Sequence, residues 1–301
     1  MVRRLALDEI IEGSSPSSPA SNFLTEVIRD NIRSMNNIEE IQKRIESKGA
    51  AFVDSMITDQ EAYYDVRADV YEEQNEIPVR RNRREAMYKI YHAILPSLLP
   101  SQITYMDFGC GTGSTTADFI AGMYDYAEVA QGYAVDISPK MIELARQNLP
   151  SFTTEQGGPY KLDSENKFDL ITAFFHVVCH LTDTELGLFF QNAHKCLKPN
   201  GVVCFEVVKQ LKVGERGYTQ ADKEQNRRFW AYPSEKKDGT KVRDKNGQLV
   251  VGTDRMFERD EIINFAMSNG LGVVEIKEAL VTDPDDTTSS NKELVVVLKK
   301  L

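Results

Sequence analysis

Apolar residues in the central and C-terminal parts of the chain gather in short runs, separated by segments in which apolar positions recur at helical spacing. Seven runs are typical of strands: 105–108, 131–135, 151–154, 167–175, 202–208, 272–279 and 293–298. Helical patterns cover 83–98, 186–197 and 256–270, and further helices begin near 114 and 139. Strands that alternate with helices predict an α/β domain whose sheet is mainly parallel, and the last two strands are expected to form an antiparallel pair.

Two amphipathic helices are predicted ahead of this domain. Apolar residues recur at helical spacing from Phe23 to Met35, and a second helical pattern covers Ile38 to Met56. These helices could cap the mouth of the sheet, form a homodimer contact or pack as scaffold, and the sequence leaves the three open. Residues 1–20 contain a Ser- and Pro-rich stretch that buries little, which is typical of a disordered tail.

We therefore divide the chain into a disordered tail (1–20), an N-terminal helical cap or lid (21–100) and an α/β domain (101–301). Within the α/β domain, the polar residues 209–252 contain two turn signals between short β-like runs. This pattern predicts a hairpin-like insertion on the substrate side.

Charge and cysteine usage narrow the class of protein. The formal net charge of −10 argues against nucleic acid as a partner, because phosphate contacts need clustered Lys and Arg. The basic run from Arg80 to Arg84 is typical of the solvated face of a helix. The four cysteines lack metal-ligand spacing, so we expect buried thiols and no metal. With neither an apolar leader nor a run that could span a bilayer, we expect a cytoplasmic protein without a membrane partner.

The strand ending at Phe108 runs into a glycine-rich turn, Gly109-Cys110-Gly111-Thr112-Gly113, that opens a helix. Such a turn holds a nucleotide-like ligand against backbone amides. Glycine permits positive φ and removes the Cβ atoms that would keep a ligand off the main chain. The alternative is a tight turn that only packs a helix on the sheet.

The second strand of the domain ends in Asp136, 27 positions after Gly109. In nucleotide-type βαβ units, an acidic residue at this tip accepts hydrogen bonds from the ribose hydroxyls. Ser138 and Pro139 then suit the N-cap and first turn of a helix. A nicotinamide-dependent dehydrogenase is the less favoured alternative, because its G-x-G-x-x-G fingerprint places the third glycine one residue later than Gly113.

Together these two motifs resemble the class I methyltransferase family that uses S-adenosylmethionine. The first motif is Asp-Phe-Gly-Cys-Gly-Thr-Gly from Asp107, and the second is Val-Asp-Ile-Ser-Pro-Lys-Met from Val135. The resemblance implies a Rossmann-like seven-stranded, mainly parallel sheet with helices on both faces. It also implies transfer of a methyl group from S-adenosylmethionine to a nucleophilic atom of a small molecule, leaving S-adenosylhomocysteine. The alternative is a catalytically silent relative that binds the cofactor as a regulatory ligand.

The resemblance also assigns residues to the cofactor. The residues it places there share the strand ends and the glycine turn, and are Asp107, Gly109, Cys110, Gly111, Gly113, Asp136, Ile137 and Phe174. Relatives commonly bind the adenine amino group through an Asp after the third strand. This chain has glycines there, so the sequence leaves the contact to Gln156 or Asp163.

A segment upstream of the first motif, Tyr63 to Glu72, is similar to a Tyr-Asp-x-x-Ala-x-x-Tyr pattern of small-molecule methyltransferases. In those relatives the segment closes over the cofactor. The resemblance then implies that Tyr64 and Tyr71, seven residues apart on one helical face, line the chamber for methyl transfer and contact the cofactor. The alternative is ordinary aromatic packing.

Four further residues are candidates for the substrate side. His176, at the end of the fourth strand, could orient a substrate or accept its proton, whereas the alternative is a structural histidine. His180 carries the same two interpretations. Glu206 lies in an apolar strand and could face the substrate or pair with a neighbouring base. Trp230 in the insertion could line the pocket or pack the hairpin down.

Overall fold

The computed structural model of the chain describes residues 60–212, 229–233, 251–282 and 290–301. The predicted tail, the two helices before residue 57 and most of the 209–252 insertion lie outside the described residues. Among the helices that are described, none combines the length and the apolar character needed to cross a membrane.

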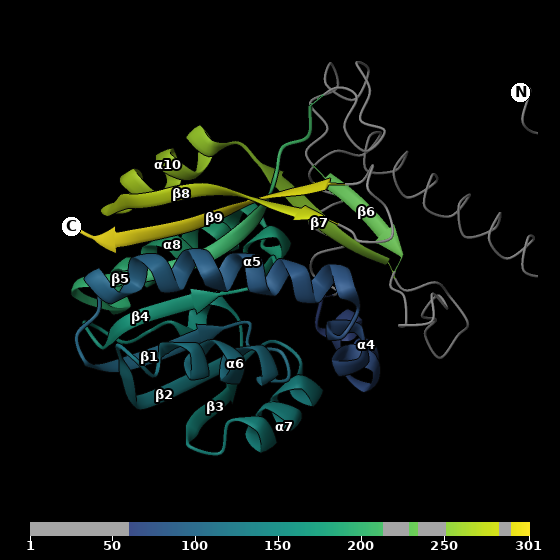
Figure 1. Ribbon diagram of the computed structural model, residues 1–301, viewed down its shortest axis with the longest axis horizontal. Coiled ribbons are helices and arrows are strands. Elements are labelled where there is room, and N and C mark those ends of the chain that lie inside the picture. The colour runs from purple at the N-terminus through teal and green to yellow at the C-terminus, as the bar shows by residue number, and fades with distance from the viewer. Residues whose placement is uncertain (1–59, 213–228, 234–250, 283–289) are drawn as a thin grey trace, which may run out of the picture.

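The strands of the described residues form one sheet (Figure 1). Seven of its strands pair in the order β3 (Phe152–Gln156), β2 (Glu128–Asp136), β1 (Gln102–Phe108), β4 (Phe168–Ala173), β5 (Leu197–Lys209), β9 (Ser290–Lys300) and β8 (Leu271–Thr282). The first five strands pair in parallel, and β9 runs antiparallel to both β5 and β8. The predicted Rossmann-like sheet, mainly parallel and ending in an antiparallel pair, is confirmed.

A hairpin of two further strands extends this sheet. β6 (Phe229–Pro233) pairs antiparallel with β7 (Val251–Phe257), and β7 joins the end of β5 through Val208 and Lys209. A hairpin is therefore present, with β6 inside the predicted 209–252 insertion and β7 starting at the end of this insertion and continuing beyond it. Its effect is to bring Asp254 of β7 toward the end of β4.

Helices cover both faces of the sheet, because alternate strand residues point to opposite sides. On one face, Tyr105 of β1 packs with Tyr91 of α5 (Pro78–Ile94) and Phe119 of α6 (Ser114–Met123). On the other face, Phe108 packs with Phe189 of α8 (Asp183–Cys196), and α10 (Arg259–Ser268) adds to the same core. Figure 1 shows α5 running across one of these faces.

Local capping explains where several helices begin. In α7 (Pro139–Asn148), the Oγ of Ser138 accepts from the backbone N of Met141 at 3.2 Å, and Pro139 occupies the first turn, as predicted. α8 opens with a capping box between Thr182 and Glu185. These caps fix where α7 begins after β2 and where α8 begins after the short turn that follows β4.

The basic run from Arg80 to Arg84 lies in α5, and the expectation of a solvated face is wrong for two of its residues. Arg83 Nε lies 3.3 Å from Glu293 Oε1, and the Arg83 side chain is 17% exposed. Arg84 pairs with Asp118 at 3.6 Å and is 13% exposed. α5 also begins five residues earlier than predicted, because Pro78 can occupy a first helical turn.

Candidate active site

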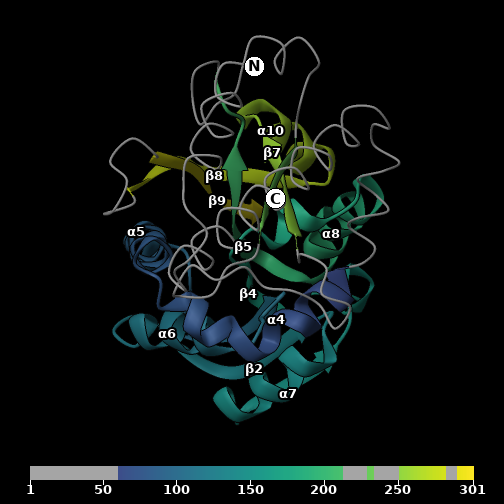
Figure 2. The same ribbon diagram turned by 90° about the vertical axis from the view of Figure 1, so that its right-hand side faces the viewer.

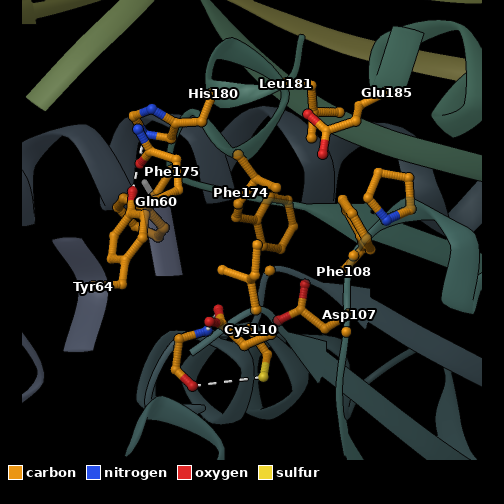
Figure 3. A pocket seen from close by; sticks show the side chains of 18 of the residues that line it. Gln60, Tyr64, Asp107, Phe108, Cys110, Phe174, Phe175, His180, Leu181 and Glu185 are labelled. Carbon is orange, nitrogen blue, oxygen red and sulfur yellow. Dashed lines mark hydrogen bonds between the residues drawn. The ribbon is translucent and has the colours of Figure 1, made fainter. Parts of the chain in front are cut away.

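A cavity opens at the carboxyl ends of β1, β2 and β4, the edge at which open α/β sheets bind ligands. α4 (Gln60–Asn75) lies across this edge, as Figure 2 shows from that side. The cavity is lined by the glycine turn, the ends of these strands, α4 and the segment after β4 (Figure 3). Of the predicted site residues, it brings together Tyr64, Tyr71, Asp107, Gly109, Cys110, Gly111, Asp136, Ile137, Phe174 and His180.

The three glycines of the turn all have positive φ, but they differ in what a Cβ would meet. At Gly109 (φ 75°) a Cβ would lie 2.4 Å from Val177, and at Gly111 (φ 55°) it would approach the Tyr71 ring at 3.4 Å. Gly113 (φ 79°) does not line the cavity. It is the N-cap of α6, and a Cβ there would lie 2.8 Å from Leu149. The expectation that all three clear space for a ligand is therefore wrong for Gly113, which permits helix packing.

Asp136, at the end of β2, is hydrogen-bonded to the glycine turn that follows β1. Its Oδ2 accepts from the backbone N of Gly111 and its Oδ1 from that of Ser138, each at 2.9 Å. Burial raises the pKa of Asp136 to about 6, although these backbone donors oppose the shift. Each carboxylate oxygen has a second lone pair, so both can still accept from a ribose hydroxyl.

Asp107 lies on the cavity wall beside this turn. Its Oδ1 accepts from Thr172 Oγ1 at 2.7 Å, and its Oδ2 accepts from Thr116 Oγ1. Burial raises the pKa of Asp107 to about 6. Two threonine hydroxyls thus fix its carboxylate at the ligand edge of β1.

α4 is docked on both motifs. Ser138 Oγ donates to Asp65 at 2.5 Å, and Thr112 Oγ1 donates to Glu72. Arg67 is buried beneath the tyrosine rings of the helix, 5.5 Å from the centroid of Tyr64 and 5.4 Å from that of Tyr71. The segment predicted as a lid is therefore a helix that borders one side of the cavity and makes polar contacts to the glycine turn and to the start of α7.

The side of the cavity expected to hold adenine is lined by Ile137, Gly157, Gly158 and Pro159. Gln156 differs from expectation, because it lies outside the lining and its Nε2 donates to the carbonyl oxygen of Ile137 at 3.1 Å. It can therefore support Ile137 but does not face the cavity.

His176 also differs from expectation, because its ring does not line the cavity. Nδ1 lies 3.1 Å from Asp254 Oδ2, and Nε2 lies 2.6 Å from Glu293 Oε2. Two consecutive left-handed residues, Phe175 (φ 57°) and His176 (φ 65°), turn the ring inward. Such conformations are strained outside glycine, so the buried ion pairs must hold the turn in place.

The charges of this buried cluster follow from their mutual contacts. Burial alone would lower the pKa of His176, but the carboxylates of Glu293 and Asp254 outweigh it and raise the pKa to about 10. Burial would raise the pKa of Asp254, yet the charge of His176 lowers it to about 2 and also lowers the pKa of Glu293. His176 is therefore a cation at neutral pH and is unsuited to accept a substrate proton.

Glu206 is fully buried and accepts from the backbone N of His176 through Oε1 at 3.2 Å. Burial raises its pKa to about 8, so it is protonated at neutral pH. It does not line the cavity, and its partner is a backbone amide, so the structure supports neither the substrate-facing interpretation nor an ion pair with a neighbouring base. Trp230 lies in β6 opposite Asp254, while its side chain falls outside the described residues.

His180 is the histidine that lines the cavity. The Tyr64 hydroxyl lies 2.9 Å from His180 Nε2, and the two rings meet edge to face with centroids 5.8 Å apart. Asp254 Oδ1 lies 3.5 Å from the same nitrogen. Figure 3 shows Tyr64, His180 and Gln60 on one side of Phe174, with Leu181 and Glu185 on the other.

Sequence reasoning missed the lining residues Gln60 and Glu185 and the buried partners Asp254 and Glu293. The signal for Glu293 was visible, since a carboxylate that opens the apolar run Leu294–Leu298 needs a partner. Asp254 carried no comparable signal, because its contact with His176 depends on how the β6–β7 hairpin pairs with β5.

Comparisons with known proteins agree with this geometry. The sequence model of a family described as "Methyltransferase domain" matches residues 79–271. A dTDP-3-amino-3,4,6-trideoxy-alpha-D-glucopyranose N,N-dimethyltransferase from Streptomyces venezuelae is 30% identical over 114 residues, 38% of this chain and 46% of that protein. The match thus spans less than half the length of this relative.

Solved structures share the fold at low identity. A DhpI–SAM–HEP complex superposes with a TM-score of 0.57 at 16% identity, covering 80% of this chain and 96% of the other. Burkholderia thailandensis 1,6-didemethyltoxoflavin-N1-methyltransferase, with its substrate and S-adenosylhomocysteine bound, gives 0.51 at 18%, covering 81% and 87%. The CcbJ methyltransferase from Streptomyces caelestis gives 0.54 at 20%, covering 79% and 97%.

Proposed function

Because this chain belongs to the methyltransferase-domain family, we propose that it transfers a methyl group from S-adenosylmethionine to a nucleophilic atom of a small molecule. The cofactor is S-adenosylmethionine, which neighbouring structures hold as such or as S-adenosylhomocysteine. The observation that carries the proposal is that the glycine turn, the Asp136 carboxylate and the helix α4 line one cavity.

The residues of this cavity fit the cofactor. Gly109 and Gly111 offer backbone without side chains, and the Asp136 oxygens retain lone pairs for two ribose hydroxyls. We assign the methionine end to the side of Asp107 and Cys110, and the adenine to the side of Ile137 and the residues 157–159.

S-adenosylmethionine, when bound, supplies a methyl group that its sulfonium already activates. What remains for the protein is to orient the acceptor and to exclude water. Orientation raises the effective concentration of the acceptor at the methyl group, and exclusion of water prevents side reactions. Tyr64 and Tyr71 of α4 together with Phe174 of β4's end form the aromatic walls that serve this purpose.

A small acceptor is supported by the closed shape of the site and by the relatives. Asp65 and Glu72 hold α4 onto the cavity, which favours a molecule that can be enclosed. The Streptomyces relative is named for an amino sugar, and the Burkholderia enzyme for 1,6-didemethyltoxoflavin. The acidic chain makes nucleic acid a poor alternative.

Calorimetric titration with S-adenosylhomocysteine tests the cofactor site. A screen with radiolabelled S-adenosylmethionine against phenol, catechol, aniline, benzylamine and benzoate, followed by a wider metabolite panel, tests the reaction. Label in an acceptor supports the proposal. Tight binding of S-adenosylhomocysteine without label in any acceptor would favour the silent, cofactor-binding alternative, and absence of binding would refute both.

A further inference from the structure

A chain of polar contacts leads from the cavity wall into the interior. It begins at the Tyr64 hydroxyl, passes through His180 Nε2 at 2.9 Å and continues to Asp254 Oδ1 at 3.5 Å from that nitrogen. The other oxygen of Asp254 contacts His176 at 3.1 Å. Tyr64 and His180 line the cavity, whereas His176 and Asp254 lie behind it.

The two histidines of this chain of contacts are placed for different tasks. Both nitrogens of the His176 ring contact carboxylates, so the ring is a fixed cation that keeps Asp254 ionised. His180 instead has its Nε2 directed at a phenol hydroxyl on the cavity wall. In the tautomer whose Nε2 accepts from this hydroxyl, that nitrogen carries no proton and can take one up.

We propose that His180 is the catalytic base of the reaction, that Tyr64 relays the acceptor's proton to it, and that Asp254 is the positioning residue that stabilises the imidazolium so formed. This inference rests on the proposed methyl transfer. It defines the substrate class as a neutral nucleophile that carries an O–H or N–H, such as an alcohol, a phenol or an amine.

The proton and electron balance closes within this arrangement. A lone pair of the acceptor's heteroatom bonds to the methyl carbon as the carbon–sulfur bond breaks, and that electron pair stays on sulfur. The proton released by the heteroatom passes to the Tyr64 oxygen while the proton of Tyr64 passes to His180 Nε2. The products are the methylated acceptor, a neutral thioether and an imidazolium that faces Asp254 at ion-pair distance.

Tyr64 acts as a relay and not as the base itself. Burial holds the pKa of Tyr64 well above its usual value, although Arg67 opposes the shift. The hydroxyl therefore keeps a proton at neutral pH and can accept one only as it gives its own away.

Gln60 supports the same substrate class. Its side chain lines the cavity near Tyr64 and is 7% exposed, and its Oε1 has no hydrogen-bond partner among the described residues. A buried amide oxygen without a partner is costly, so a ligand that donates an O–H or N–H there would be favoured.

Nitrogen NMR of the histidine rings tests the proposal without a known acceptor. The full chain, saturated with S-adenosylhomocysteine and ¹⁵N-labelled in its four histidines, reports the charge and tautomer of each ring. His180 signals are assigned by their loss in His180→Gln. We expect His180 to be neutral at pH 8 with Nε2 unprotonated, and His176 to stay charged.

Two variants test the partners. Tyr64→Phe should shift the Nε2 resonance of His180, whereas Tyr63→Phe, which removes the neighbouring hydroxyl that faces Arg67, should leave it unchanged. Asp254→Asn should also shift the Nε2 resonance of His180, because it removes the carboxylate charge that lies 3.5 Å from that nitrogen. If Asp254→Asn does not fold, the Tyr64→Phe comparison still decides.

A proton on Nε2 at pH 8, an unchanged Nε2 resonance in folded Asp254→Asn, or equal resonances in Tyr64→Phe and wild type would overturn the proposal. Calorimetry on the same samples separates this outcome from failure of the proposed function, because S-adenosylhomocysteine binding does not require the base. For each phenol or amine that the wild type methylates, His180→Gln should lower kcat by about 10²- to 10⁴-fold, and an unchanged kcat would also refute the role.

Discussion

Glu206→Gln should change how the stability of the protein depends on pH. Burial raises the pKa of Glu206 from 4.5 to about 8, so the folded protein binds an extra proton between these values. The contribution of this group is therefore most favourable at low pH and is lost as the pH rises through 8. From pH 5.5 to pH 8 the loss amounts to about 3 kcal/mol of unfolding free energy.

Glutamine has nearly the same shape as the protonated acid and cannot ionise, and its amide oxygen can still accept from the backbone N of His176. Urea unfolding followed by circular dichroism, at pH 5.5 and at pH 8, gives the free energy of unfolding for both proteins. We expect the wild type to lose about 3 kcal/mol relative to Glu206→Gln between these two pH values.

The same measurement on Glu165→Gln provides the control, because the Glu165 side chain is 73% exposed. Its curve should run parallel to that of the wild type. Parallel curves for Glu206→Gln as well would show that the buried carboxyl does not bind its extra proton in the folded state. The account of the cluster around His176 would then be wrong.

Three further predictions concern the cofactor and the lid. Asp136→Asn should weaken S-adenosylhomocysteine binding by about 1.5–3 kcal/mol, or roughly 10- to 150-fold in Kd by calorimetry, and an unchanged Kd in the folded variant would remove the ribose assignment. Gly111→Ala should weaken S-adenosylhomocysteine binding, because φ is 55° at this residue. The control Gly187→Ala should leave binding unchanged, because a Cβ there meets no atom within 4 Å. Equal affinities of the two variants would show that the turn is only structural. Hydrogen exchange over 60–75 should slow on adding S-adenosylhomocysteine while 168–173 stays slow throughout, and an unchanged pattern would show that α4 is scaffold.

The sheet and its motifs could be predicted from the sequence because their signals are local. Apolar runs of strand length, glycines in a tight turn and an N-cap serine followed by proline all act within a few residues. Asp136 and the glycine turn were instead linked by the βαβ unit to which both belong, and the structure joins them through the Gly111 backbone N.

The substrate side was predicted less well because its contacts are long-range. Glu293 and Asp254 lie far from His176 in sequence, and the left-handed turn at Phe175 and His176 has no glycine to announce it. A pattern of residues cannot show which way such a turn points its side chains. Both His176 and His180 were therefore expected on the substrate side, whereas only His180 lines the cavity.

The two histidines show how one turn divides structural from chemical tasks. His176 and His180 are four residues apart and are equally polar, so composition treats them alike. The turn directs the first ring to Asp254 and Glu293, where two carboxylates fix its charge. The second ring follows one short 3₁₀ turn later, Val177–His180, and reaches Tyr64 on the cavity wall. Asp254 contacts both rings, and His176 holds its carboxylate ionised. If His180 takes up a proton, this carboxylate stabilises the resulting imidazolium.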